Sequence, residues 1–235
     1  MDREKNIKTL KTAVVASVPV MAGYIVMGIA FGIMLAAKGY NALWALAMSM
    51  TMYAGSMQFV AVDILSRSAS LVSAAIMTVL VNARHIVYGI SMLGKYRNIG
   101  KIKPYLIFAL TDETYALLSG NVPENMNKKL YYFAVSLLDQ LYWIIGCTTG
   151  ALIGERLTIN TTGIDFAMTA LFVVIFTEQW LSTKDHTAAL LGVGITIACL
   201  LVLGSENFLI PAMVLIVATL GIMEYIRGKK ATENE

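Results

Sequence analysis

Ionisable side chains interrupt apolar runs at several points, and the first cluster reads Asn82-Ala83-Arg84-His85-Ile86-Val87-Tyr88. On a helix, Asn82, Arg84, His85 and Tyr88 share one sector of roughly 160° and can face one cavity. A guanidinium binds a carboxylate through two hydrogen bonds, and an imidazole titrates near neutral pH. We therefore predict that Asn82, Arg84 and Tyr88 bind a substrate and that His85 couples the site to protons. The alternative is a helix end from which Arg84 extends to the lipid headgroups.

The second cluster is the acidic pair Asp112-Glu113, which follows Thr111. Two adjacent carboxylates in an apolar segment need a cation, a cavity or a position at a membrane surface. Arg84 or His85 is the natural partner, and protonation of one carboxyl would couple the site to a proton gradient. The alternative is structural: Thr111 or Asp112 caps a short helix that starts near Glu113.

Two further groups complete the predicted site. Gly55 and Ser56 precede Gln58, and a Gly-Ser break in a helix frees backbone groups that can hold the charged ends of a substrate. We predict that these three residues bind substrate. Asp139 lies beside Gln140 in the middle of an apolar run, and we predict that it joins Asp112 and Glu113 in proton coupling.

Signatures of enzymes and metal centres are absent from the sequence. No HExxH, GxSxG, Walker A or GxGxxG pattern occurs, and the chain has only two His residues. Cys147 and Cys199 lie in apolar runs and are interpreted as packing residues. We therefore predict no enzymatic activity, no metal and no cofactor; an intramembrane Ser/His hydrolase is the remaining enzymatic alternative. The basic clusters lack interleaved aromatic residues, so nucleic acid is not an expected partner.

The composition predicts the elements that must position these residues. Of 235 residues, 57% are hydrophobic and 14% are charged, whereas a soluble domain carries about 25% charged residues. The 26 residues between Lys11 and Lys38 carry no formal charge, and a spanning helix needs roughly 20. These values exclude a soluble enzyme, a secreted disulfide scaffold and a disordered regulator. The chain is predicted to be an all-α polytopic membrane protein that forms a single transmembrane domain, residues 1–235.

About seven or eight hydrophobic segments are predicted, and two of them are irregular. The segments cover residues 12–37, 41–62, 68–94, 104–120, 130–154, 164–181, 187–205 and 207–226. Segments 41–62 and 104–120 contain the Gly-Ser break and the acidic pair, so we predict that both are re-entrant or broken. Asp165 and Glu178, near the ends of segment 164–181, are explained by helix capping and by an interfacial position.

The placement of Lys and Arg residues gives an orientation. If all eight segments cross, with the N-terminus inside, the count is 11 inside against 6 outside; if segments 41–62 and 104–120 are re-entrant, it is 14 against 3. A seven-span arrangement with the N-terminus outside gives 11 against 6. Positive charge collects on the cytoplasmic side, so all three alternatives place the C-terminus in the cytoplasm.

A faint internal repeat relates the two halves, 12–118 and 130–226. Tyr24-x3-Gly28-x3-Gly32 is echoed by Tyr142-x3-Gly146-x3-Gly150, and the stretch from Ala47 to Phe59 resembles the stretch from Ala167 to Trp180. Weak internal symmetry with broken helices is typical of transporters. The alternative for the glycine motifs is ordinary close packing of helices.

These residues resemble the AzlC-type family, the large subunit of bacterial branched-chain amino acid exporters. The resemblance runs from about Pro19 to Ile222 and shows no departure from the main strings. These strings are Gly28-x2-Phe31-Gly32, Ser56-x-Gln58-Phe59, Asn82-x-Arg84-His85-x2-Tyr88, Thr111-Asp112-Glu113-x-Tyr115 and Gly163-Ile164-Asp165-Phe166-Ala167-Met168-Thr169-Ala170-Leu171-Phe172.

The resemblance implies export of leucine, isoleucine and valine, with methionine as a further candidate, across the bacterial plasma membrane. It also implies a small hydrophobic AzlD-type partner subunit. From the residues we expect a proton-coupled secondary exporter that works by alternating access. The substrate carboxylate would meet Arg84 or a half-helix N-terminus, its ammonium would meet Asp112, Glu113 or Gln58, and its side chain would lie among Met57, Phe59 and Tyr88. The alternative is a channel or a non-transporting membrane scaffold.

Overall fold

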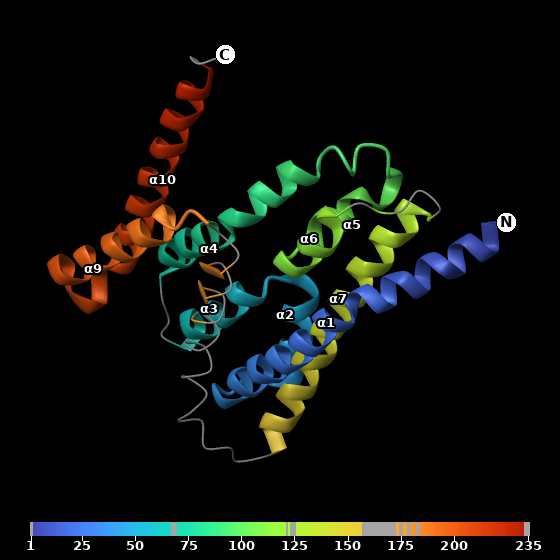
Figure 1. Cartoon of the computed structure of the whole chain (residues 1–235). Coiled ribbons are helices and arrows are strands. Elements are labelled where there is room, and N and C mark those ends of the chain that lie inside the picture. The colour runs from blue at the N-terminus through green and yellow to red at the C-terminus, as the bar shows by residue number, and fades with distance from the viewer. Residues whose placement is uncertain are drawn as a thin grey trace. The chain divides into compact units, whose positions relative to one another are not determined.

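The computed structural model describes residues 2–66, 70–120, 122, 126–156, 173, 176–177, 180–181 and 184–232. Two compact units divide the chain: Met1–Ala69 with Val81–Ala167, and Ser70–Leu80 with Met168–Glu235. Within the described ranges every regular element is a helix, which confirms the predicted all-α class (Figure 1). The first unit contains all the residues of the predicted site.

Ten elements follow one another along the described chain. They are α1 (Asp2–Ala37), α2 (Ala42–Thr51), α3 (Gly55–Ser66), α4 (Leu71–Met92), the 3-10 turn η1 (Gly100–Ile102), α5 (Lys103–Phe108), α6 (Asp112–Ser119), α7 (Lys128–Arg156), α9 (Thr187–Asn207) and α10 (Leu209–Thr232). Four stretches are long and apolar enough to cross a membrane: Arg3–Ala37, Leu71–Met92, Lys128–Arg156 and Thr187–Gly204. Ala42–Thr51 and Pro211–Met223 are shorter apolar helices. The chain is therefore a polytopic membrane protein.

Helices α1 and α7 pack against each other through the two glycine motifs. A Cβ atom at Gly32 would lie 2.2 Å from the Cys147 carbonyl oxygen, and one at Gly150 would lie 2.2 Å from the Ile29 carbonyl oxygen. Only glycine permits so close an approach of two backbones. Gly146 lies against Tyr24 and Ile25, and Gly150 lies against Ile29, so the two helices run in the same direction. The close-packing interpretation of these motifs is confirmed.

Both irregular segments are broken helices, as predicted. Segment 41–62 breaks at residues 52–54 between α2 and α3, and segment 104–120 breaks at residues 109–111 between α5 and α6. Apolar helix on either side of a short break produces two half-helices with free backbone groups at the break.

The α5–α6 pair begins and ends at one end of α7. Gly100, just before α5, lies near the Lys129 ammonium at the start of α7. At the other end of the pair, the Lys95 ammonium donates to the carbonyl oxygens of Leu118 (2.9 Å) and Gly120 (2.7 Å). Lys5, Lys95, Lys128 and Lys129 line one cavity of about 710 Å³. The α5–α6 pair is therefore a hairpin that enters and leaves at this end, which we call the basic end.

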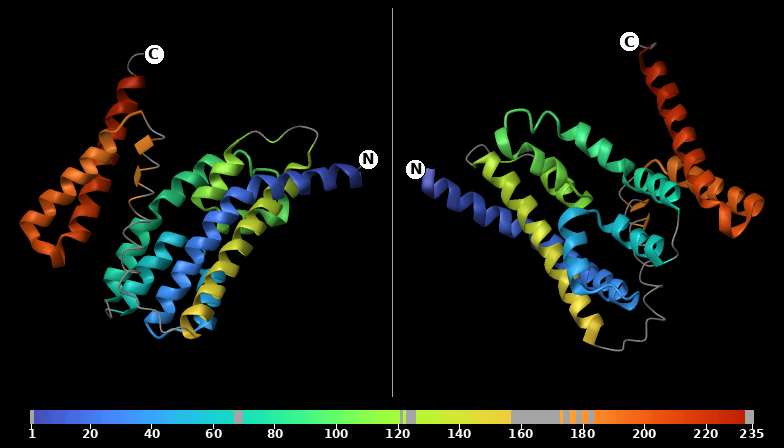
Figure 2. Two further views of the ribbon diagram at one scale, coloured as in Figure 1. Left: turned by 60° about the horizontal axis from the view of Figure 1, so that its bottom comes forward. Right: turned by 180° about the vertical axis from the view of Figure 1, so that it is seen from behind.

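The α2–α3 pair enters from the opposite end. The Ala42 N–H, at the start of α2, donates to the side chain of Glu155 near the last turn of α7. In α3, Gln58 accepts a hydrogen bond from Trp143 of α7. The next residue, Phe59, packs edge-on against Phe31, which lies near the C-terminal end of α1. In Figure 2 (left) the C-terminal ends of α1, α3 and α7 lie at the same side of the first unit.

The two hairpin tips meet beside Tyr24 of α1. The Tyr24 ring lies 6.5 Å from the Tyr53 ring at the α2–α3 break, and its hydroxyl contacts Thr111 at the α5–α6 break. Lys5, Lys95, Lys128 and Lys129 line one cavity, whereas the arrangement in which all eight segments cross would place Lys95 on the other side of the membrane from Lys5. The first unit therefore agrees with re-entrant segments 41–62 and 104–120, the alternative for which the sequence alone gives 14 basic residues on one side and 3 on the other.

Candidate functional site

The N-terminus of α6 is capped by Thr111. Its extended backbone (φ −91°, ψ 177°) places its Oγ1 where it accepts a hydrogen bond from the Thr114 N–H at 3.2 Å. Asp112 and Glu113 therefore occupy the first turn of α6, where the helix dipole favours negative charge. The capping interpretation of this sequence is confirmed, and it is compatible with a functional role for both carboxylates.

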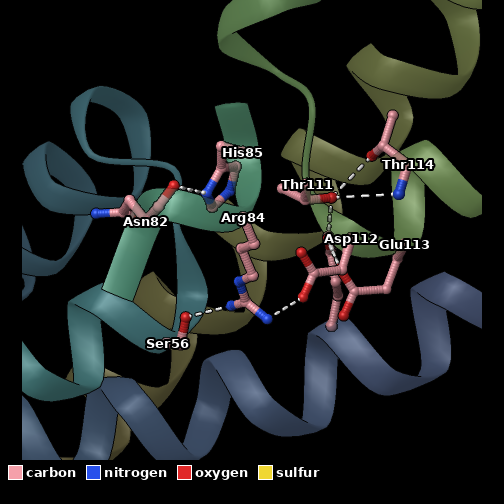
Figure 3. A network of polar contacts seen from close by, with 9 residues as sticks. Ser56, Asn82, Arg84, His85, Thr111, Asp112, Glu113 and Thr114 are labelled. Atoms are coloured by element: carbon pink, nitrogen blue, oxygen red, sulfur yellow. Dashed lines mark hydrogen bonds and ion pairs between the residues drawn. The ribbon is translucent and has the colours of Figure 1, made fainter. Parts of the chain in front are cut away.

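Arg84 links the first turns of two half-helices. Its guanidinium donates to Ser56 Oγ at the start of α3 and to Asp112 Oδ2 at the start of α6 (Figure 3). The Arg84 and Asp112 side chains are 27% and 31% exposed, so the ion pair is partly accessible. Arg84 is thus the partner of the acidic pair, one of the two cations that the sequence offered.

The neighbouring residues of α4 make different contacts. His85 Nδ1 lies 3.2 Å from the Asn82 carbonyl oxygen, and its ring lies 6.1 Å from that of Tyr88. Tyr88 stacks on Tyr115 of α6, with ring centroids 4.6 Å apart. Tyr88 therefore joins the site as an aromatic wall, whereas the contacts of His85 found in the described part of the chain place it beside Asn82 and Tyr88.

The start of α3 is held against Trp143 of α7. A Cβ atom at Gly55 would lie 3.1 Å from the Trp143 ring, so glycine allows this approach. Trp143 Nε1 donates to Gln58 Oε1 at 2.6 Å, and the Gln58 side chain is fully buried. Trp143 fixes the Gln58 side-chain amide through its oxygen, and the Gln58 Nε2 group has no hydrogen-bond partner among the described residues. Sequence reasoning missed Trp143, because an aromatic residue in an apolar run is usually a packing residue.

Asp139 is fully buried in the middle of α7. Its Oδ2 accepts a hydrogen bond from Thr114 Oγ1 at 2.8 Å. The structure thereby joins Asp139 to the α5–α6 tip, as expected if it belongs to the same site as Asp112 and Glu113.

Tyr24 connects the groups that the sequence predicted separately. Its hydroxyl donates to Glu113 Oε2 at 2.7 Å and lies 2.6 Å from Thr111 Oγ1. Its ring packs edge-on against Trp143 at 5.3 Å. Sequence reasoning used Tyr24 only as a marker of the repeat. The signal that could have identified it is its hydroxyl, which needs a polar partner when it lies deep in a membrane.

Several buried polar atoms around the two tips have no hydrogen-bond partner among the described residues. Four of them are Gln58 Nε2, Arg84 Nε, Asp112 Oδ1 and Asp139 Oδ1. Buried polar groups are rarely left unpaired, and each unpaired group costs about 1–3 kcal/mol. Amide, guanidinium and carboxylate groups together complement a ligand that carries both an ammonium and a carboxylate.

Some of the sequence predictions concern residues outside the described ranges. These are Asp165, Glu178, the string Gly163 to Phe172 and most of the second copy of the longer repeat, from Ala167 to Trp180. The predicted two-fold repeat of halves 12–118 and 130–226 remains a prediction, although its two glycine motifs contact each other.

Comparison with known proteins identifies the family. Residues 19–157 match the model of the AzlC protein family. The branched-chain amino acid transport protein AzlC of Bacillus subtilis is 44% identical over 212 residues, which cover 90% of this chain and 82% of the relative. A membrane protein of Helicobacter pylori is 43% identical over 91% of this chain and 94% of the relative. The inner membrane protein YgaZ of Escherichia coli is 27% identical over 75% and 76%. No solved structure matches. The family model matches most of the first unit, and the two relatives at 43–44% identity align over most of their length. The chain therefore belongs to the AzlC family.

Proposed function

We propose that this chain is a secondary transporter that moves branched-chain amino acids across the membrane by alternating access. The observation that carries the proposal is the meeting of two hairpin tips at Arg84, which links Ser56 and Asp112 at the starts of α3 and α6. Half-helix termini at mid-membrane hold the charged ends of substrates in transporters. The B. subtilis relative is named as a branched-chain amino acid transport protein.

The substrate would bind by exchange of partners. Its carboxylate would take the place of Asp112 on Arg84, helped by the free N–H groups of the first turn of α3. Its ammonium would meet the released Asp112 carboxylate and Glu113. The exposure of the Arg84–Asp112 pair supports this exchange, because a partly accessible ion pair can open without the cost of a buried one.

The aliphatic side chain would lie against the apolar residues of α3 and the aromatic wall of α4 and α6. Met57 and Phe59 are buried beside Ser56 and Gln58, and Tyr88 stacks on Tyr115. A pocket of this kind separates substrates that differ by one methylene by only about 1–3 kcal/mol, so leucine, isoleucine, valine and methionine are all expected to bind.

Export, coupling to protons and assembly with a small AzlD-type subunit belong to the same proposal. The lysine-lined cavity at the basic end supports entry from the cytoplasm of a bacterium, because positive charge collects there and attracts the substrate carboxylate. The C-terminus would lie on this side. Copurification of the small subunit with the full chain tests the assembly.

Counterflow of labelled leucine in proteoliposomes tests transport, with and without the small subunit. Arg84→Gln should reduce counterflow by roughly 10–100-fold, because a hydrogen-bonded charge contributes about 1.5–3 kcal/mol. Arg97→Gln, which removes a guanidinium from an exposed turn, is the matched control and should keep full activity. A channel would give no counterflow, and a scaffold would give no leucine flux. Either result would overturn the proposal.

A further inference from the structure

A row of three hydroxyl groups connects two carboxyl groups on different helices. Starting at Glu113 Oε2, the row passes through the Tyr24 hydroxyl, Thr111 Oγ1 and Thr114 Oγ1, and it ends at Asp139 Oδ2. The four oxygen–oxygen distances along it are 2.7, 2.6, 3.0 and 2.8 Å. All four lie within the range of O–H···O hydrogen bonds.

The row excludes water over most of its length. Tyr24 is 5% exposed and Thr111 is 6% exposed, whereas Thr114 and Asp139 are fully buried. Glu113 is half-buried and lies next to the partly accessible Arg84–Asp112 pair. The row therefore leads from the candidate substrate site, through α1 and the tip of α6, to a carboxyl group in the interior of α7.

A count of hydrogen atoms shows what the row requires. Each of its four contacts needs one hydrogen, and the three hydroxyl groups supply one hydrogen each. The fourth hydrogen has to come from one of the two carboxyl groups. With both carboxylates ionised, one contact places two oxygens at hydrogen-bond distance with no hydrogen between them; with both protonated, one contact holds two hydrogens. The observed spacing is satisfied in full when the pair holds a single proton.

We propose that Glu113 and Asp139 share one proton and exchange it along this row, which is the proton-coupling element of the transporter. In one state Glu113 is protonated and donates to Tyr24, Tyr24 donates to Thr111, Thr111 to Thr114, and Thr114 to ionised Asp139. When each hydrogen moves to the next oxygen, four O–H bonds break and four form. Asp139 is then protonated and Glu113 is ionised. One proton has crossed from α6 to α7, and the three hydroxyl groups are restored.

The charged and titratable groups around the row connect it to the substrate. Arg84 and Asp112 lie beside Glu113, and the buried Tyr53 lies beside Tyr24 at the α2–α3 tip. While Asp112 pairs with Arg84, the guanidinium compensates the negative charge of the carboxylate next to Glu113. When a substrate carboxylate takes Arg84, Asp112 exchanges the guanidinium for the substrate ammonium, which also lies beside Glu113, so the charges next to Glu113 change and with them the position of the shared proton. This step rests on the proposed function, because it needs a substrate that competes for Arg84.

Replacement of Thr114 by valine tests the row with little change of shape. The substitution Thr114→Val removes the hydroxyl that contacts Asp139, whereas Thr114→Ser keeps a hydroxyl at the same position and is the matched control. Unlike Thr111, Thr114 does not cap α6 through its side chain. Tyr24→Phe interrupts the same row two contacts away and serves as a second variant if Thr114→Val does not fold.

The assay separates proton movement from substrate movement. In proteoliposomes, leucine counterflow at equal pH on both sides needs no net transfer of protons, whereas leucine accumulation driven by a pH gradient does. We expect Thr114→Val and Tyr24→Phe to keep counterflow within about threefold and to lose gradient-driven accumulation by roughly 100-fold, the usual effect of removing a positioned proton-transfer group. Thr114→Ser should resemble the unmodified protein in both measurements.

The outcomes distinguish the two proposals. Absence of counterflow in the unmodified protein overturns the proposed function. Counterflow without any response to a pH gradient leaves the transporter but overturns the proton row. Gradient-driven accumulation that survives in both Thr114→Val and Tyr24→Phe also overturns the row, as does equal loss of both activities, which would show that the hydroxyl groups serve only to hold the structure.

Discussion

Replacing Gly32 by alanine is expected to separate α1 from α7. The added Cβ atom would lie 2.2 Å from the Cys147 carbonyl oxygen and 2.4 Å from the Ala151 nitrogen, and both are backbone atoms that cannot rotate away. Ordinary contacts begin at 3.4 Å, so the helices must move apart by about 1.2 Å along this direction. Overpacking of this kind costs about 1–3 kcal/mol. At roughly 2–4 °C per kcal/mol for a chain of this size, we expect Tm to fall by about 5 °C.

Gly23→Ala is the matched control, because Gly23 lies on the same helix and an added Cβ atom there meets nothing within 4 Å. Alanine is favoured over glycine in a helix by roughly 0.5–1 kcal/mol, so this variant should be unchanged or slightly more stable. Thermal unfolding of the purified protein in detergent measures both variants. Equal Tm values for Gly32→Ala and Gly23→Ala would refute the parallel glycine contact on which the placement of Tyr24 depends.

Three further changes probe other contacts of the first unit. Trp143→Phe removes the hydrogen bond to Gln58 and should lower the free energy of unfolding by about 1–3 kcal/mol, which chemical denaturation can measure. Lys95→Met removes the ammonium from the last carbonyls of α6 and should destabilise the protein by roughly 1–2 kcal/mol in the same assay, whereas Lys101→Met, at an exposed position, should have no effect. The single variants Lys101→Cys and Tyr40→Cys should react with impermeant thiol reagents from opposite sides of the membrane; labelling of both from one side would exclude the opposed hairpins.

The sequence predicted the class, the breaks and the ion pair for simple physical reasons. Low charge content requires a lipid environment, and a Gly-Ser or Asp-Glu interruption cannot face lipid as regular helix. Arg84 needs an anion at that depth, and the pair Asp112-Glu113 needs a cation, so their contact was one of two expected pairings, with His85 as the other cation. Each of these arguments uses a residue whose burial is expensive.

The residues that sequence reasoning missed are those whose burial is ordinary. Tyr24, Trp143 and Thr114 look like packing residues in any apolar run, and their partners lie 87, 85 and 25 residues away. The hairpins were also ambiguous, because segment 41–62 has the length of a full crossing. What distinguishes a hairpin is the position of its two ends, and this depends on contacts with α7 that no local pattern contains.

Two basic residues hold helix α6, one at each of its ends. Arg84 of α4 contacts the first turn of α6 at the partly accessible Asp112, and Lys95, in the turn that follows α4, donates to the carbonyl oxygens at the last turn of α6. A ligand that takes Arg84 releases the first attachment and leaves the second intact. Helix α6 then becomes a lever whose pivot is Lys95 at the basic end. The end of α6 that carries Asp112 is then held by the contacts of Tyr24 with Thr111 and Glu113 and of Thr114 with Asp139, so a rotation about Lys95 acts directly on the row of hydroxyl groups.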